Sequence, residues 1–156
     1  MSALKSLRVL LAEDESPWQH KIRKVLEQSG HTVEVVSSYA EAFAKFTAEA
    51  FDLTIVDLRL GPDIDNRDGV FLLEDAFAKG IPAIVITGHG TRDMIKQANR
   101  HDALRLMHKG SFDIAEFKQI VDVIARTTAP DSHSPTPRET ENVKELLRRL
   151  AAGKPI

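Results

Sequence analysis

Side chains able to bind cations and phosphate stand directly after short apolar runs at four places in this 156-residue sequence. The runs are LRVLLA, FDLTIV, PAIVI and ALRLMH. The side chains that follow them are Glu13, Asp14, Glu15, Asp57, Thr87 and Lys109. If the runs are parallel strands of one sheet, their carboxyl ends share one edge, where doubly wound sheets bind ligands. Several carboxylates, one hydroxyl and one ammonium group would then meet at that edge.

The chemistry of such an edge is phosphoryl binding assisted by a divalent cation. Two carboxylates about 4 Å apart repel by roughly 4 kcal/mol at an effective dielectric constant near 20, and a hard cation relieves that cost. Oxygen ligands without His or Cys favour Mg²⁺ over a transition metal. Thr87 can donate a hydrogen bond to a phosphate oxygen, and Lys109 can pair with it as a point charge. Asp57 stands alone at the end of the central strand and is the best candidate for a carboxylate nucleophile.

The elements that must position these residues alternate five times between strand and helix patterns. Apolar runs predict strands over residues 7–12, 32–36, 51–56, 82–86 and 103–108. A 3.6-residue apolar period predicts helices that begin near residues 16 and 38 and helices over 70–79, 92–100 and 114–126. Five such units in series predict a parallel sheet with helices on both faces.

Capping residues mark where several of these helices begin. We expect Ser16 to be the N-cap of the first helix, and Asp113 to cap the fifth. Residues 38–41 read as a capping box at the start of the second helix. That second helix is expected to bury Phe43 and Phe46.

The composition of the strands predicts their order in the sheet. The first, third and fourth runs are almost entirely apolar, as expected for strands covered on both faces. The second and fifth carry Glu34 and Arg105 in alternation with apolar residues, as edge strands do. The predicted fold is therefore an α/β, flavodoxin-like doubly wound (βα)5 sheet with strand order 2-1-3-4-5, followed by a C-terminal helix.

The chain divides into one domain and a short C-terminal extension. The domain covers residues 1–126, and a proline-rich linker covers 127–137. Residues 138–156 are predicted to contain an amphipathic helix whose apolar stripe is Val143, Leu146, Leu147 and Leu150. This stripe can pack on its own domain or join a partner, and a homodimer through this helix is one such arrangement.

Overall composition limits the classes of protein that this sequence can encode. The charges nearly balance, with 21 Lys and Arg against 23 Asp and Glu, and no cysteine is present. These values exclude a collagen, a wholly disordered chain and a disulfide scaffold. No apolar run is long enough for a membrane span, and the N-terminus is not a signal peptide, so we expect a cytoplasmic location. Basic residues form no single block, which argues against direct DNA binding.

Five motifs in order give the sequence a resemblance to a known family. They are LLAEDESP, FDLTIVDLRL, a downstream Asp68-Gly69, IPAIVITGHG and LMHKGSFD. At this spacing they resemble the receiver domain of the response regulators of bacterial two-component systems, over residues 7–126. The resemblance implies a signalling phosphoprotein rather than an enzyme, with at most self-catalysed phosphotransfer and autodephosphorylation.

The resemblance also implies a role for each site residue. Asp57 would accept a phosphoryl group from a histidine of a sensor kinase or phosphotransfer protein. Mg²⁺ would be held by Asp14, Asp57 and the backbone carbonyl of Arg59, with Glu13 acting largely through water. Thr87 and Lys109 would bind the acyl phosphate and report it to the surface of the fourth helix, fifth strand and fifth helix. The output would be protein–protein contact.

The sequence departs from the family pattern in four ways. Glu13 replaces the first Asp of the usual acidic pair, and Leu106 replaces the aromatic residue that normally moves when the Thr moves. Gly110 follows the Lys where Pro is usual, so we expect a trans peptide bond there. The loop over residues 57–69 is longer than is common in the family, and it adds three acids, namely Asp63, Asp65 and Asp68, beside the site.

Two other classes of function compete with phosphorylatable signalling. Glu13, Leu106 and Gly110 leave open a pseudo-receiver, which would be an interaction module that works without phosphorylation. An enzyme on the same architecture fits less well. A flavin site needs a Ser, Thr or Gly phosphate loop after the first strand, where this sequence has acidic EDESP, and a carboxylate-nucleophile phosphatase needs a second Asp at the position of Arg59.

Overall fold

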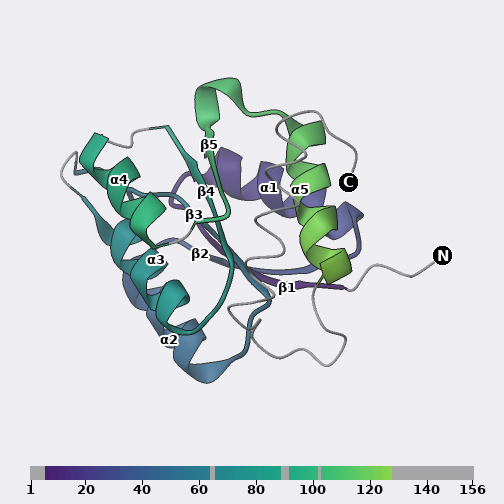
Figure 1. Cartoon of the computed structure of the whole chain (residues 1–156), viewed down its shortest axis with the longest axis horizontal. Helices are drawn as coiled ribbons and strands as arrows, with labels where there is room; N and C mark the ends of the chain where they lie inside the picture. Colours follow the sequence, from purple (N-terminus) through teal and green to yellow (C-terminus); the bar gives the residue numbers. More distant parts are fainter. Residues whose placement is uncertain (1–5, 64–65, 89–91, 102, 128–156) are drawn as a thin grey trace.

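Five parallel strands form the centre of the protein in the order β2-β1-β3-β4-β5, which confirms the predicted topology (Figure 1). The computed structural model describes residues 6–63, 66–88, 92–101 and 103–127. The strands are β1 (Arg8–Ala12), β2 (Thr32–Val36), β3 (Leu53–Val56), β4 (Ala83–Thr87) and β5 (Arg105–His108). β2 and β5, which carry Glu34 and Arg105, are the edge strands as expected.

Helices cover both faces of this sheet. They are α1 (Ser16–Gln28), α2 (Tyr39–Ala48), α3 (Asp68–Ala78), α4 (Arg92–Arg100) and α5 (Ile114–Thr127), with a single 3₁₀ turn, η1 (Lys109–Ser111). α1 and α5 lie together on one face, while α2, α3 and α4 lie on the other (Figure 1). None of these helices has both the length and the apolar composition needed to cross a bilayer.

The hydrophobic core lies on the two faces of the sheet, and β1 contributes to both. Val9 and Leu11 belong to the cluster under α1 and α5, whereas Leu10 and Ala12 belong to the cluster under α2 and α3. This split follows from the strand geometry, which points successive side chains to opposite faces. All of β3 is buried, so the strand that precedes Asp57 is fixed on every side.

Two of the predicted helix starts are confirmed by their hydrogen bonds. Ser38 Oγ accepts a hydrogen bond from the backbone N–H of Glu41 at 3.2 Å. Asp113 Oδ1 accepts one from the backbone N–H of Ala115 at 2.8 Å. The Ser38 hydroxyl and the Asp113 carboxylate thus each accept a hydrogen bond from a backbone N–H that has no partner within the first turn of its helix.

Two local predictions are wrong. Ser16 is the first residue of α1 rather than its N-cap, because the carbonyl of Glu15 already accepts hydrogen bonds from the backbone of Trp18 and Gln19. Phe43 is not buried but 46% exposed. Its position on α2 turns it away from the sheet, where its ring stacks on that of Tyr39 instead, 6.0 Å between centroids.

Several predictions concern residues outside the described ranges. These include most of the linker over 127–137, the whole helix predicted over 138–156, and Asp65. The linker prediction began one residue too early, because Thr127 is the last residue of α5.

Candidate functional site

The carboxyl ends of β1, β3, β4 and the turn after β5 bring the predicted site residues together. Glu13 and Asp57 are each 3% exposed and Thr87 is 0% exposed, whereas Asp14 faces solvent. The ladder between β1 and β3 continues into the site, since the backbone N–H of Asp57 donates to the carbonyl of Ala12 at 3.0 Å. The acids are therefore held by the sheet itself rather than by long loops.

Asp57 is held through both of its carboxylate oxygens. Thr87 Oγ1 donates to Asp57 Oδ1 at 2.8 Å, and the backbone N–H of Arg59 donates to the same oxygen at 3.2 Å. Lys109 Nζ donates to Asp57 Oδ2 at 2.9 Å. The predicted nucleophile, hydroxyl and ammonium group are thus in direct contact.

Lys109 is shared among three carboxylates. Its Nζ lies 3.0 Å from Glu13 Oε1, 3.1 Å from Glu15 Oε2 and 2.9 Å from Asp57 Oδ2, and its side chain is only 8% exposed. The ring of Trp18 lies beside it, with Nζ 5.3 Å from the ring centroid. A lysine has three N–H donors, so each carboxylate takes one of them.

Burial and neighbouring charge shift two pKa values at this site. Burial, followed by the charge of Asp57, raises the pKa of Glu13 to about 7, although hydrogen bonds from Glu15 and Lys109 act in the opposite direction. For Lys109, burial lowers the pKa, but hydrogen bonds and charge from Asp57 and Glu13 outweigh it and the net pKa is raised. Lys109 is therefore positively charged, and its charge offsets the repulsion among the neighbouring carboxylates.

The carboxylates fit a hard divalent cation. Glu13, Asp14 and Asp57 each offer an oxygen, and these oxygens lie within 4.8 Å of one another. All of the donors are oxygens, the ligand type that Mg²⁺ prefers. Within the described ranges, Asp63 and Asp68 do not belong to this group, so the acids of the long loop are not brought into it.

Gly69 is a site residue whose role only the structure reveals. A Cβ atom at this position would lie 1.9 Å from the backbone oxygen of Asp57 and 2.5 Å from Cα of Leu58. Its backbone N–H donates to the carbonyl of Leu58 at 3.1 Å. The start of α3 thus presses directly against the backbone that carries Asp57, which explains the Asp68-Gly69 motif.

Sequence reasoning also missed two side chains that organise the rim. The sequence places Glu15 at the rim but does not predict its contact with Lys109. Gln19 Nε2 donates to the carbonyl of Glu13 at 2.5 Å and to Ser37 Oγ at 3.0 Å, which ties the loop after β1 to the loop after β2. The run of three acids signalled Glu15, but no sequence pattern signalled Gln19.

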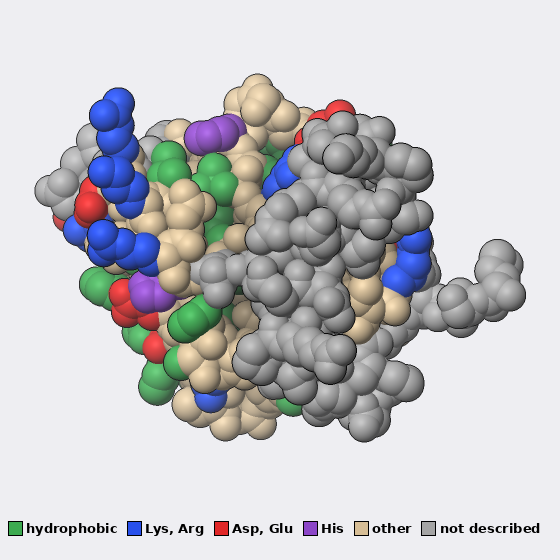
Figure 2. All heavy atoms as spheres, viewed as in Figure 1, with side chains coloured by type: hydrophobic (Ala, Val, Ile, Leu, Met, Phe, Trp, Pro, Cys, Tyr) green, Lys and Arg blue, Asp and Glu red, His purple; other side chains and the backbone are tan. Residues whose placement is uncertain are grey.

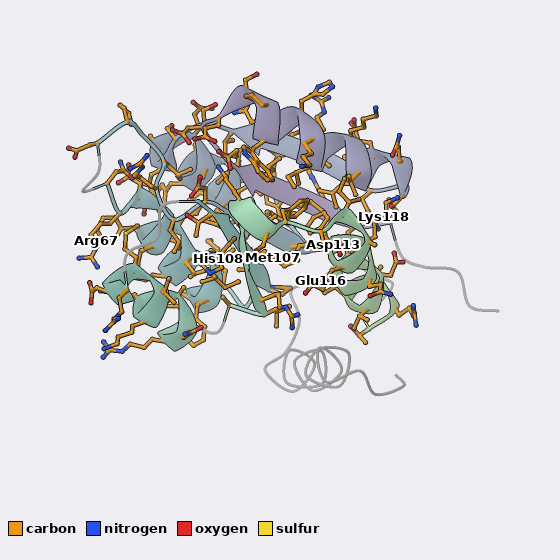
Figure 3. The ribbon with its side chains drawn as sticks, turned by 90° about the horizontal axis from the view of Figure 1, so that it is seen from above. Arg67, Met107, His108, Asp113, Glu116 and Lys118 are labelled. Atoms are coloured by element: carbon orange, nitrogen blue, oxygen red, sulfur yellow. The ribbon has the colours of Figure 1, made fainter. Side chains whose placement is uncertain are left out.

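The long loop after Asp57 is organised by Asn66. Asn66 Oδ1 accepts from the backbone N–H of Leu60 at 2.9 Å and from that of Asp68 at 3.0 Å. The neighbouring Arg67 forms an ion pair with Asp93 in the first turn of α4. Figure 3 shows Arg67 beside α4, far from the labelled residues of α5. Asn66 therefore ties the beginning of the loop to the start of α3, and Arg67 joins it to α4.

Two other departures have simple structural outcomes. Leu106 is half-buried and packs against the cluster that α4 and β4 share, so it fills ordinary edge-strand space. The peptide bond between Lys109 and Gly110 is trans, as expected. Lys109 reaches Asp57 across this turn.

Comparisons with known proteins give one consistent result. The family model described as the response regulator receiver domain matches residues 9–122. The chain is 29% identical over 145 residues to the alginate biosynthesis transcriptional regulatory protein AlgB of Pseudomonas aeruginosa, covering 93% of this chain and 28% of that protein. It is 28% identical to the transcriptional regulatory protein FixJ of Rhizobium meliloti, covering 94% of this chain and 75% of that protein.

A solved structure shows the same fold. It is the CheY-like response regulator receiver domain protein from Methanospirillum hungatei, with a TM-score of 0.67 and 20% identity, covering 92% of this chain and 99% of that one. The chain spans only about a quarter to a third of the first AlgB and FleR relatives that it matches, which are longer regulators.

Proposed function

Because the chain belongs to the response regulator receiver domain family, we propose that Asp57 accepts a phosphoryl group from a phosphohistidine. The donor is a sensor histidine kinase or a phosphotransfer protein, and the signal is passed on by protein–protein contact.

The observation that carries this proposal is the set of contacts around Asp57. One carboxylate oxygen attacks phosphorus, the bond from phosphorus to the histidine nitrogen breaks, and that nitrogen keeps the electron pair. Thr87 and Lys109, 2.8 Å and 2.9 Å from the carboxylate oxygens, are placed to bind the oxygens of the transferred group. Fixed donors aimed at developing negative charge are the usual source of rate in phosphoryl transfer.

The acidic rim fits the Mg²⁺ that the family uses. Asp14, Asp57 and the backbone carbonyl of Arg59 would hold the ion, with Glu13 acting largely through water. Bound there, Mg²⁺ supplies positive charge that offsets both the clustered carboxylates and the phosphoryl oxygens. The side chain of Glu13 is one methylene group longer than that of the usual Asp. One of its carboxylate oxygens also accepts a hydrogen bond from Lys109 Nζ at 3.0 Å. We therefore propose that Asp14 is the stronger ligand.

A pseudo-receiver is the second candidate. Leu106 favours it, because a leucine packed in an edge-strand cluster lacks the aromatic ring through which the family signals. The intact contacts among Asp57, Thr87 and Lys109 favour phosphorylation more strongly, since an interaction module has no need of them.

We propose that a phosphorylated chain passes its signal through α4, where exposed Lys and Arg side chains gather at the surface (Figure 2).

Incubation of the full chain with acetyl phosphate and Mg²⁺, followed by intact mass spectrometry, tests the proposal. The wild type should gain the mass of one phosphoryl group, and Asp57→Asn should not. Glu27→Gln, which changes an exposed carboxylate on α1 away from the site, is the control and should behave as the wild type. A gain that persists in Asp57→Asn would reject this phosphoacceptor, and no gain in the wild type would favour the pseudo-receiver.

A further inference from the structure

Glu15 is the one exposed carboxylate of the three that contact Lys109. Its side chain is 43% exposed, whereas those of Glu13 and Asp57 are 4% and 2% exposed. Glu15 also stands outside the acid group that fits a cation, which consists of Glu13, Asp14 and Asp57 among the residues that the structure describes. Glu15 is therefore neither the phosphoacceptor nor a ligand of the cation, although it lies 3.1 Å from Lys109 Nζ.

The start of α1 explains why this side chain points at the site. Glu15 occupies the N-cap position of α1, yet its carboxylate makes no capping hydrogen bond to the helix. Its backbone N–H donates instead to Glu13 Oε1 at 3.0 Å. Glutamate is not among the residues that ordinarily cap a helix through their side chains, so the carboxylate of Glu15 is available for the contact with Lys109.

A phosphoryl group on Asp57 can take over the one N–H of Lys109 that already contacts Asp57, but any further N–H of Lys109 must be released by another carboxylate. All three donors of Lys109 are used, one by each carboxylate. Releasing Glu13 would leave a buried carboxylate without its cation, which is costly. Releasing Glu15 costs much less, because its exposed carboxylate can be hydrated.

We propose that Glu15 holds, in the unphosphorylated protein, the place on Lys109 that the phosphoryl group takes over. It is a positioning residue: it acts through Lys109, competes with the incoming phosphoryl oxygens and slows phosphorylation. This inference rests on the proposed function, since it requires that Asp57 be phosphorylated.

The test compares Glu15→Gln with wild type in the full chain. The rate of phosphorylation by acetyl phosphate is measured by intact mass spectrometry at fixed Mg²⁺, at low salt and at about 1 M NaCl. Glu27→Gln is the matched control, because Glu27 lies on the same helix and is 50% exposed in an ion pair with Arg23 away from the site. Thermal melting of each variant checks that it is folded, and Glu15→Ser replaces Glu15→Gln if the latter does not fold.

We expect Glu15→Gln to be phosphorylated about two- to fivefold faster than wild type at low salt, the range that corresponds to an ion pair of this exposure. The advantage should shrink towards onefold at about 1 M NaCl, where the Debye length is about 3 Å. Glu27→Gln should match the wild type in both conditions. A merely structural role for Glu15 would not produce this salt dependence.

An equal or slower rate for Glu15→Gln at low salt would overturn the inference, as would an increase that persists unchanged at high salt. Either result leaves the proposed function intact, because Asp57 is still phosphorylated. A wild type that gains no phosphoryl group at all would instead reject the proposed function, and the inference with it.

Discussion

Replacement of Gly69 by alanine is the most direct test of how the fold supports Asp57. Gly69 lies in the first turn of α3 with an ordinary helical backbone, so helix propensity alone predicts that Gly69→Ala stabilises the protein by about 0.5–1 kcal/mol. The structure predicts the opposite sign. The added Cβ would meet the backbone oxygen of Asp57 at 1.9 Å, a distance that no rotation of a side chain can relieve.

The size of the effect follows from the atoms involved. Overpacking a well-packed interior costs about 1–3 kcal/mol and sometimes more. Here the obstruction is backbone at the carboxyl end of the fully buried β3, so we expect the upper part of that range, about 3 kcal/mol. For a domain of this size, that loss corresponds to a fall in melting temperature of roughly 6–12 °C.

Urea and thermal unfolding of Gly69→Ala and of a control, Gly110→Ala, measure this effect. Gly110 has no atom within 4 Å of an added Cβ and no positive φ, so its replacement should leave the free energy of unfolding unchanged or raise it by up to about 1 kcal/mol. A Gly69→Ala protein as stable as the wild type would refute the argument that α3 presses on the backbone of Asp57. Phosphorylation of Asp57 should fall in Gly69→Ala and not in Gly110→Ala.

Three further predictions concern buried and clustered charges. Burial lowers the pKa of His31, so the unfolded chain takes up a proton first, and the free energy of unfolding should fall as pH drops below about 6.5, by at most about 1.4 kcal/mol per pH unit. The raised pKa of Glu13 makes the free energy of unfolding rise as the pH falls through part of the same range. The contribution of His31 is therefore measured as the difference in free energy of unfolding between wild type and His31→Gln, and a difference that does not change with pH would contradict the prediction. Asp14→Ala should weaken Mg²⁺ binding in a calorimetric titration far more than Glu13→Ala, and equal losses would contradict the assignment of Asp14 as the stronger ligand. Lys109→Met should lower the free energy of unfolding by about 3–5 kcal/mol at pH 8, because it leaves buried carboxylates without a cation, and by less at pH 5, which lies below the raised pKa of Glu13, about 7; a loss independent of pH would show that packing rather than charge is responsible.

The sheet and the identity of the central site residues could be predicted because both depend on short-range patterns. Apolar runs mark strands, and a polar residue at the end of a run must lie at the carboxyl edge of a parallel sheet. Glu34 and Arg105 marked the edge strands because a charged side chain is tolerated only where one side is open to water. Asp57, Thr87 and Lys109 met as expected, since each directly follows a strand of the sheet.

The failures arise where the local sequence does not determine which atoms of the rest of the fold a residue will face. Phe43 and Phe46 are both aromatic residues on α2, and periodicity did not decide which of them faces the sheet. Gly69 could not be recognised as indispensable, because nothing in its own neighbourhood of the sequence records how close the backbone of Asp57 comes. Such distances depend on tertiary packing.

The error at the start of α1 connects directly to the chemistry of the site. A serine N-cap at Ser16 would have bonded its own hydroxyl to the first turn and left Glu15 in the preceding loop. Because α1 begins at Ser16, Glu15 takes the N-cap position, and its carboxylate turns to Lys109 rather than to the helix. At this helix boundary Glu15 lies beside the site, where it is the third carboxylate in contact with Lys109. With three carboxylates on its three donors, Lys109 offers an incoming phosphoryl group only the N–H that already contacts Asp57 until another acid is displaced, and the exposed Glu15 is the acid that water can hydrate at least cost.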